Sequence, residues 1–205
     1  MTNITIIGAG NMGQAIAGIA AAGGNSVQIL TRDAEKSAAV SAVTDSGVIG
    51  DVITGDIVVL ALPYGAVSLV LESYAGQLDG KVLVDLTNPV DFSTFDSLVV
   101  PAASSAAAEI AAAVPGASVL KAFNTNFAAT LATGTVGREK TTVLIAGDDT
   151  DAKASLAAVV TAGGLKAVDA GSLKRARELE ALGFVQLTLA AGEKTSWTSG
   201  FALAD

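Results

Sequence analysis

A glycine-rich segment near the N-terminus has the residue types and spacing of a phosphate-binding loop. It directly follows a β-branched stretch at residues 4–7 and consists of Gly8, Ala9, Gly10, Asn11, Met12 and Gly13. In a G-x-G-x-x-G loop, the first glycine permits a tight turn, the second lets a pyrophosphate approach the backbone, and the third lets the next helix pack closely. The N–H groups and the dipole of that helix hold the phosphates. The segment therefore predicts a dinucleotide site, and a glycine turn that binds nothing is the alternative.

The end of the second predicted strand lacks the acidic residue that usually accepts hydrogen bonds from the ribose of NAD. Leu30 and Thr31 occupy that position, and Arg32 and Lys36 follow. A guanidinium pairs with a 2′-phosphate through two hydrogen bonds and stacks on adenine. Asp33 is predicted to cap the next helix instead of facing the ribose. We therefore expect Thr31, Arg32 and Lys36 to hold the 2′-phosphate of NADPH, with a solvated surface role for Arg32 as the alternative.

Two further strand ends carry proline and are expected beside the nicotinamide. One reads Leu62-Pro63 and the other Asn88-Pro89. Ligands of open α/β sheets bind outside the carboxyl ends of the strands, where these prolines would rigidify the loops. Asn88 offers hydrogen bonds to the ribose or to the ring. An ordinary strand-to-helix turn also favours proline and asparagine, and it stays open as the alternative for each segment.

A third strand end places two amides and a hydroxyl between two aromatic rings, at residues 123–127. This set suits the floor of a site for a flat heterocycle. Asn124 and Asn126 would then position that ring, whereas a capping turn is the alternative. Asp148 and Asp149 follow a later strand and suggest a metal, but a loop and helix cap is the favoured interpretation. No metal site is predicted.

The composition excludes several kinds of chemistry. Histidine and cysteine are both absent, which excludes imidazole bases, thiolate nucleophiles, disulfides and Cys/His zinc sites. A net charge of -8 gives no electrostatic reason to bind nucleic acid or an anionic membrane. The N-terminus has neither the basic nor the apolar region of a signal peptide, and no apolar run is long enough to span a membrane. We therefore expect a cytoplasmic protein with small-molecule partners.

Predicted strands and helices alternate along most of the chain, and an aliphatic composition suits strands that are buried on both faces. Strands are expected at residues 4–7, 27–30, near 48, 56–62, 81–86, 118–123, 142–146 and 165–169. Helices are expected at residues 12–22, 34–40, 65–75, 104–114, 151–161 and 174–191. Residues 90–101 are predicted to form a surface loop, and residues 125–140 show no clear period.

This alternation predicts an α/β fold. We expect a Rossmann-type, doubly wound, mostly parallel sheet with a small C-terminal α/β extension. A boundary in the aperiodic segment would separate an NADP-binding Rossmann domain, residues 1–137, from a small C-terminal α/β domain, residues 138–205.

Several segments, in order along nearly the whole chain, resemble the coenzyme F420-dependent NADP oxidoreductase family, whose members are related to the oxidoreductase domain of the STEAP metalloreductases. The matching segments are IIGAGNMG at 6–13, TRD at 31–33, residues 56–63, residues 85–89, SSAAAE at 104–109, KAFNTNF at 121–127, residues 143–148 and DAGSL at 169–173. The KAFNTNF and DAGSL segments are more specific than the glycine loop.

The resemblance implies hydride transfer between nicotinamide C4 of NADP(H) and a flavin or a deazaflavin such as F420, bound in a cleft beside the nicotinamide. It also implies a homodimer. By position, residues 9–13 would bind the phosphates, Leu62, Pro63, Asn88 and Pro89 would form the nicotinamide pocket, and Asn124 and Asn126 would face the acceptor. The deazaflavin-using reductases tend to have histidine where Asn124 stands, so the identity of the acceptor and the physiological direction stay open.

Two other functions compete with this one. The stretch from Gly10 to Ile16 also resembles pyrroline-5-carboxylate reductases and related imine or β-hydroxyacid reductases, which act on small imine or carbonyl substrates. Those families continue into a long all-helical domain, whereas strands and helices here still alternate late in the chain. A non-catalytic NADPH sensor would suit the lack of acid and base residues, but the acceptor-side motif favours turnover.

Overall fold

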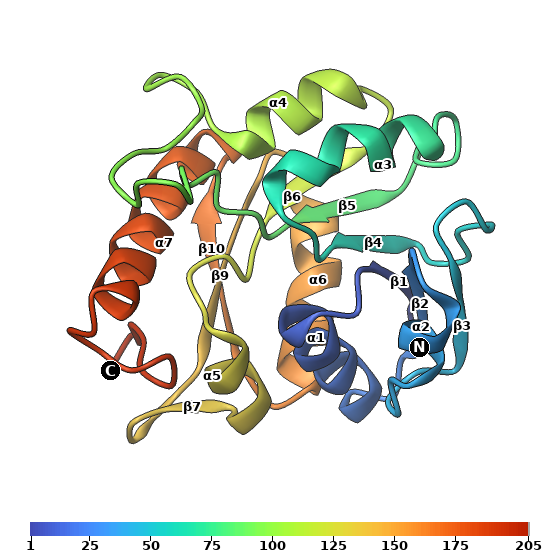
Figure 1. Cartoon of the computed structure of the whole chain (residues 1–205). Coiled ribbons are helices and arrows are strands. Elements are labelled where there is room, and N and C mark those ends of the chain that lie inside the picture. Colours follow the sequence, from blue (N-terminus) through green and yellow to red (C-terminus); the bar gives the residue numbers. More distant parts are fainter. Residues whose placement is uncertain (205) are drawn as a thin grey trace.

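The computed structural model describes residues 1–204 and contains an eight-stranded sheet with helices on both faces (Figure 1). Its strands are β1 (Asn3–Ile7), β2 (Ser26–Thr31), β3 (Asp45–Val48), β4 (Ile57–Leu60), β5 (Val82–Asp85), β6 (Ser118–Lys121), β9 (Thr142–Gly147) and β10 (Lys166–Gly171). Their order in the sheet is β10-β9-β6-β5-β4-β1-β2-β3. Every neighbouring pair is parallel except β6 and β9. The predicted Rossmann-type, mostly parallel sheet is confirmed.

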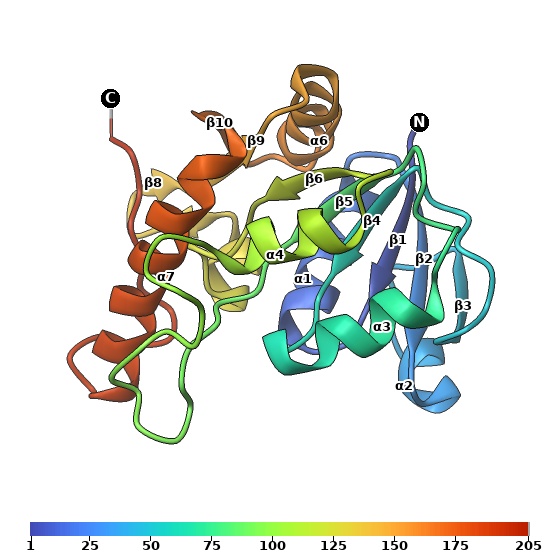
Figure 2. The same cartoon turned by 90° about the horizontal axis from the view of Figure 1, so that it is seen from above.

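The helices are α1 (Asn11–Ala22), α2 (Ala34–Ala38), α3 (Val67–Ser73), α4 (Ala106–Ala113), α5 (Ala128–Thr133), α6 (Thr150–Ala162) and α7 (Ala176–Ala191). Short 3-10 turns at Tyr64–Ala66 and Leu173–Arg175 precede α3 and α7. One apolar cluster joins α1 and α6 to one face of the sheet, through residues such as Ile16 and Leu156. A second cluster joins α3 and α4 to the other face, where these helices lie side by side (Figure 2). None of the described helices is long and apolar enough to cross a membrane.

The sheet reverses its direction of growth between β1 and β4, which are parallel neighbours although β2 and β3 separate them in the sequence. The carboxyl ends of these two strands therefore face a crevice, the usual ligand site of a doubly wound sheet. The glycine loop leaves β1 at this crevice, and the Leu62-Pro63 segment leaves β4 beside it.

The segment without a clear period, residues 125–140, folds into elements that the sequence did not predict. It contains α5 and a two-stranded ribbon of β7 (Thr135–Val136) and β8 (Glu139–Lys140). For the strand after β6 to run parallel to it, the chain would first have to return to the end of the sheet at which β6 begins. The six-residue α5 does not carry the chain there, and β9 consequently runs antiparallel to β6.

The C-terminal α/β part extends the same sheet. The proposed boundary at residues 137 and 138 falls in the turn between β7 and β8, and β9 and β10 continue the sheet beyond β6. Val143 and Val160, from this part, share an apolar cluster with Ile6 and Val27. The division into two domains stays a prediction. The two parts share one sheet, and both contribute to the apolar cluster that contains α1 and α6.

Candidate functional site

The glycine loop is shaped by close approaches that exclude side chains. Gly8 has φ +117°, and a Cβ there would lie 2.1 Å from the carbonyl oxygen of Ala61. A Cβ on Gly13 would lie 2.0 Å from the carbonyl oxygen of Gly8. No atom lies within 4 Å of the Cβ position of Gly10, so the loop is open on that side. Two of the glycines thus pack the loop against β4 and α1, and the third leaves room for a ligand.

The N-terminus of α1 is available to an anion. The helix begins at Asn11, its N-cap residue is Gly10, and it has neither a side-chain cap nor an acidic residue in its first turn. The first N–H groups of a helix have no partner within the helix, and they carry the positive end of its dipole. Residues 9–13 therefore present the donors that a pyrophosphate requires.

The residues predicted to bind the 2′-phosphate surround a cavity of about 320 Å³ beside this loop. The lining includes Gly8, Ala9, Gly10, Thr31, Arg32, Lys36, Leu62 and Pro63. The Asp33 side chain accepts a hydrogen bond from the backbone N–H of Glu35 and so caps α2, as expected. Thr31 donates its hydroxyl to the carbonyl oxygen of Asp33, which fixes the turn that presents Arg32. The Arg32 side chain is exposed at the cavity edge.

A second cavity, of about 440 Å³, opens at the carboxyl ends of the strands and shares Leu62 and Pro63 with the first. Its lining also includes Asn11, Met12, Tyr64, Leu86, Thr87, Asn88, Phe92, Asn124, Asn126, Phe127, Gly183, Gln186 and Trp197. The structure thus brings together the predicted nicotinamide and acceptor residues, with one exception. Pro89 is buried, and its carbonyl accepts a hydrogen bond from Val99 outside the cavity lining.

The unpaired buried polar atoms of the protein are concentrated at this second cavity. Within residues 1–204, every buried side-chain oxygen or nitrogen without a hydrogen-bond partner belongs to Thr87, Asn124, Asn126 or Gln186. All four residues line the cavity. Leaving such an atom unpaired costs about 1–3 kcal/mol, and buried polar groups in folded proteins are almost always paired. A ligand or water in the cavity would supply the missing partners, and this makes the cavity the candidate site.

Hydrogen bonds to other parts of the protein orient the asparagine side chains of the cavity. Asn88 Nδ2 donates to the carbonyl oxygen of Asn124 at 2.9 Å, and Asn124 Nδ2 donates to Asn88 Oδ1 at 3.0 Å. Asn124 Nδ2 also donates to the carbonyl oxygen of Leu179, and Asn126 Nδ2 donates to that of Thr142. The amide nitrogens are thus engaged, while Oδ1 of Asn124 and of Asn126 stays unpaired.

The turn after β6 has an unusual backbone conformation. Phe123 has φ +65°, which non-glycine residues rarely adopt, although its ring is buried. Such conformations persist where the surrounding packing enforces them, and they often occur at functional sites. Here the turn redirects the chain so that Asn124 and Asn126 both line the cavity.

A buried ionic cluster supports the same loops, and sequence reasoning missed it. Lys121 Nζ lies 2.7 Å from Asp85 Oδ2 and 2.8 Å from Glu180 Oε1, with all three side chains at most 1% exposed. Lys121 also donates to the carbonyl oxygen of Thr87 at 2.6 Å. Because burial disfavours the charged carboxylate, the pKa of Glu180 is raised, while Lys121 opposes this shift and Asp85 adds to it. The sequence did contain one signal of this cluster, because the apolar strands β5 and β6 each end in a charged residue, Asp85 and Lys121.

Two N–H groups of α4 complete this cluster. The backbone N–H of Ala106 and that of Ala107 donate to the Glu180 carboxylate at 3.0 and 3.3 Å. The cluster therefore ties β5, β6, α4 and α7 together behind the cavity. It does not line the cavity itself.

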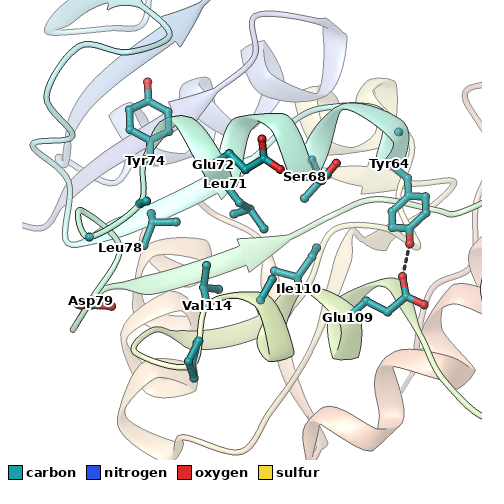
Figure 3. Close-up of a pocket in the computed structure, with 16 residues that line it drawn as sticks. Tyr64, Ser68, Leu71, Glu72, Tyr74, Leu78, Asp79, Glu109, Ile110 and Val114 are labelled. Atoms are coloured by element: carbon teal, nitrogen blue, oxygen red, sulfur yellow. Dashed lines mark hydrogen bonds between the residues drawn. The ribbon is translucent and has the colours of Figure 1, made fainter.

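Tyr64 is the only ionisable side chain in the lining of the second cavity as the structure describes it. Its hydroxyl donates to Glu109 across a separate apolar groove between α3 and α4, of about 530 Å³ (Figure 3). Burial and the Glu109 carboxylate raise the pKa of Tyr64 to about 12. The one ionisable group described in the lining of the second cavity therefore keeps its proton near neutral pH.

The two aspartates that suggested a metal have other roles. Asp149 caps α6 by accepting from the N–H groups of Asp151 and Ala152, and it also accepts from the Ser118 hydroxyl. Asp148 accepts from the N–H of Leu173. Within residues 1–204, no three acidic, histidine or cysteine side chains are grouped as a metal would require.

The chain is similar to several known oxidoreductases. Metalloreductase STEAP3 of Rattus norvegicus is 38% identical over 112 residues, which make up 55% of this chain and 22% of STEAP3. The chain thus spans about a fifth of the length of that relative. A structure described as an F420-dependent NADP reductase, from Arthrobacter sp. FB24, is 28% identical with a TM-score of 0.86 and full coverage of both chains. An imine reductase of Myxococcus stipitatus in complex with NADP+ has a TM-score of 0.69 at 21% identity, over 94% of this chain and 63% of its own, and shares the fold.

The sequence match itself covers the glycine loop, the Arg32 turn and the strand ends that carry Pro63 and Asn88. Residues 3–89 match the model of one family, NADP oxidoreductase coenzyme F420-dependent. The predicted resemblance is confirmed: residues 3–89 are similar to this family, and the Arthrobacter structure is similar over the whole chain.

Proposed function

We propose that the protein transfers a hydride between C4 of NADPH and the ring of a flavin or a deazaflavin such as F420. The nicotinamide C4–H bond breaks, the hydride goes to N5 of a flavin or C5 of a deazaflavin, NADPH is oxidised to NADP+, and water supplies the proton that the reduced ring takes up. The observation that carries the proposal is the group of unpaired amide and hydroxyl atoms in one cavity beside the glycine loop.

In this proposal the first cavity binds the adenosine end of NADPH. The N–H groups of residues 11–13 hold the pyrophosphate, because the α1 N-terminus has no competing cap. Arg32 pairs with the 2′-phosphate at the exposed edge, and Thr31 and Lys36 line the same cavity. Leu62 and Pro63 lie in both cavities, so they lead from the adenosine end to the second cavity.

In the second cavity, the main role of this chain is to position and orient the nicotinamide ring and the acceptor ring. Asn124 and Asn126 have engaged amide nitrogens and unpaired oxygens, which would accept hydrogen bonds from N–H groups of bound rings. Phe127 and Trp197, with ring centroids 5.1 Å apart, form an aromatic wall. Holding two reactants in a reactive geometry lowers the activation free energy by about 7–11 kcal/mol in favourable cases. An aromatic and amide cavity suits that role.

The ionisable groups of the cavity favour a flavin-type acceptor over a carbonyl compound. Reduction of a carbonyl forms an alkoxide that must gain a proton during the reaction, which enzymes usually supply from a positioned acid. The single ionisable lining residue that the structure describes, Tyr64, donates to Glu109 and has a pKa of about 12. A reduced flavin spreads its charge over a ring that hydrogen bonds stabilise, and it needs no such acid.

A screen of acceptors tests this proposal against the competing functions. The purified protein is incubated with NADPH and, in turn, FMN, riboflavin, F420, a ferric chelate and a cyclic imine, and the loss of NADPH absorbance is recorded. We expect oxidation with at least one flavin or deazaflavin. NADPH that binds but is never consumed would support the sensor, and consumption with the imine alone would support the imine reductase. The proposed homodimer is tested separately by analytical ultracentrifugation.

A further inference from the structure

Gln186 is a polar residue of the second cavity that the sequence analysis did not single out. It lies on α7, and the residue is 4% exposed. Both its Nε2 and its Oε1 are buried without a hydrogen-bond partner. Among the described residues, it is the one buried side-chain amide in which both ends are left unpaired. A buried amide of this kind is costly unless a ligand completes its hydrogen bonds.

The position of Gln186 is fixed by the close packing of α7. Gly183 lies one turn earlier on the same helix and also lines the cavity. A Cβ on Gly183 would lie 2.4 Å from Asn88 Oδ1 and 2.9 Å from the carbonyl oxygen of Asn124. The helix therefore approaches the two asparagines as closely as a glycine allows. Gln186 follows Gly183 by one turn and therefore lies on that same face of α7.

Gln186 belongs to the wall of the cavity that α7 and the C-terminal segment form. A Cβ on Gly200 would lie 3.7 Å from Gln186 Nε2, and Trp197 of the same C-terminal segment packs against Phe127 with the two rings tilted. The residues shared with the adenosine cavity, Leu62 and Pro63, come instead from the end of β4. In the proposed complex NADPH enters from the glycine loop, and the second ring lies against α7 beside Gln186.

An unpaired amide offers one acceptor and a donor in the same plane. Its complement is a ring edge on which a C=O stands beside an N–H. Flavins and deazaflavins share this imide edge, with N3–H between two carbonyl groups, whereas a simple imine or ketone lacks it. We propose that Gln186 recognises the imide edge of the acceptor, accepting from N3–H and donating to a neighbouring carbonyl. This inference rests on the proposed function, because it assigns the second ring to this end of the cavity.

The test measures equilibrium binding, which does not depend on turnover. Oxidised FMN and N3-methyl-FMN are titrated against the NADP+-loaded protein, and binding is followed by flavin fluorescence. Gln186→Leu removes both hydrogen-bonding ends and preserves much of the side-chain volume. Thr188→Val is the matched control, because it replaces a polar residue of α7 that does not line the cavity.

We expect Gln186→Leu to weaken FMN binding about tenfold and Thr188→Val to change it less than twofold. N3-methylation should weaken binding to the unsubstituted protein by a similar factor and should add little in Gln186→Leu, because each change removes the same contact. The affinity for NADP+ should stay within twofold. Unchanged FMN binding in Gln186→Leu, equal losses for both flavins, or a loss confined to NADP+ would each overturn the inference.

The same experiment separates the inference from the proposed function. If FMN binds with the expected dependence on Gln186 but NADPH never reduces it, imide recognition stands and the redox function fails. If NADPH reduces FMN and Gln186→Leu changes neither binding nor KM, the function stands and the inference fails. If neither FMN nor F420 binds the NADP+-loaded protein, both are overturned.

Discussion

Asn88 and Asn124 exchange hydrogen bonds across two neighbouring strand ends, with Nδ2 of each donating to an oxygen of the other at 2.9 and 3.0 Å. The pair joins the loop after β5 to the turn after β6, so the predicted nicotinamide residue and the predicted acceptor residue form one unit. Gly183 of α7 packs directly on this unit. A substitution of one asparagine should therefore alter the position of the other.

Replacing Asn124 by alanine should affect stability as well as turnover. The variant removes the donor to Asn88 Oδ1 and to the carbonyl oxygen of Leu179, which leaves a buried acceptor unpaired. We expect a loss of about 1–3 kcal/mol in the free energy of unfolding. We also expect slower turnover or a higher acceptor KM, with NADPH binding weakened only a few-fold. Denaturant titration, NADPH fluorescence and stopped-flow kinetics on the same variant measure these effects. If none of the three changes, Asn124 has no role in either the pair or the cavity.

Arg32 should select NADPH over NADH. Its guanidinium is exposed at the edge of the adenosine cavity, where a charge-assisted pair with the 2′-phosphate is worth about 1.5–3 kcal/mol. Arg32→Ala should therefore weaken NADPH binding about tenfold or more and leave NADH binding nearly unchanged. Arg138→Ala, which removes an exposed arginine far along the sequence, is the control for the loss of a surface charge. Equal losses for the two cofactors in Arg32→Ala would exclude a 2′-phosphate contact.

Gly183 should tolerate no side chain. A Cβ there would lie 2.4 Å from Asn88 Oδ1 and 2.9 Å from the carbonyl oxygen of Asn124, so Gly183→Ala must displace either α7 or the asparagine pair. We expect a loss of about 1–3 kcal/mol in unfolding free energy, typical of overpacking, together with reduced acceptor binding. Gly18→Ala is the matched control, since Gly18 also lies within a helix but has no atom within 4 Å of its Cβ position. That variant should be neutral or should gain up to about 1 kcal/mol in stability from helix propensity. Equal behaviour of the two variants would contradict the close packing of α7.

Turnover should depend little on pH between about 6 and 8, where histidine would titrate. The chain has no histidine, and the pKa of Tyr64 is raised to about 12, so this hydroxyl keeps its proton throughout that range. Only well above pH 10 would its deprotonation begin. Tyr64→Phe should accordingly leave the shape of the pH profile unchanged, even if it alters the rate through lost packing. A profile with a steep limb near pH 7 that Tyr64→Phe removes would identify Tyr64 as a proton donor.

The sequence predicted the elements that local patterns determine. The glycine loop, the Asp33 cap and most of the strands follow from residue type and spacing, and the structure has them at these positions. It did not predict α5, the β7–β8 ribbon or the antiparallel β9, because residues 125–140 have no periodic apolar pattern. It also missed Gln186 and the Lys121–Glu180 contact, which depend on how α7 docks against the sheet. A glycine within a predicted helix, Gly183, was the one local signal of that docking.

Transfer of deuterium from NADPH to a deazaflavin tests the central claim most directly. The protein is incubated with NADPH deuterated at C4 in one or the other configuration, and a 5-deazaflavin serves as acceptor, because the new C5–D bond does not exchange with water. The reduced product is then analysed by mass spectrometry. We predict that one of the two deuterated forms gives a product with a single deuterium at C5 and that the other gives none. Oxidation of NADPH without deuterium in the product, or no oxidation with any flavin or deazaflavin, would contradict direct hydride transfer in this cavity.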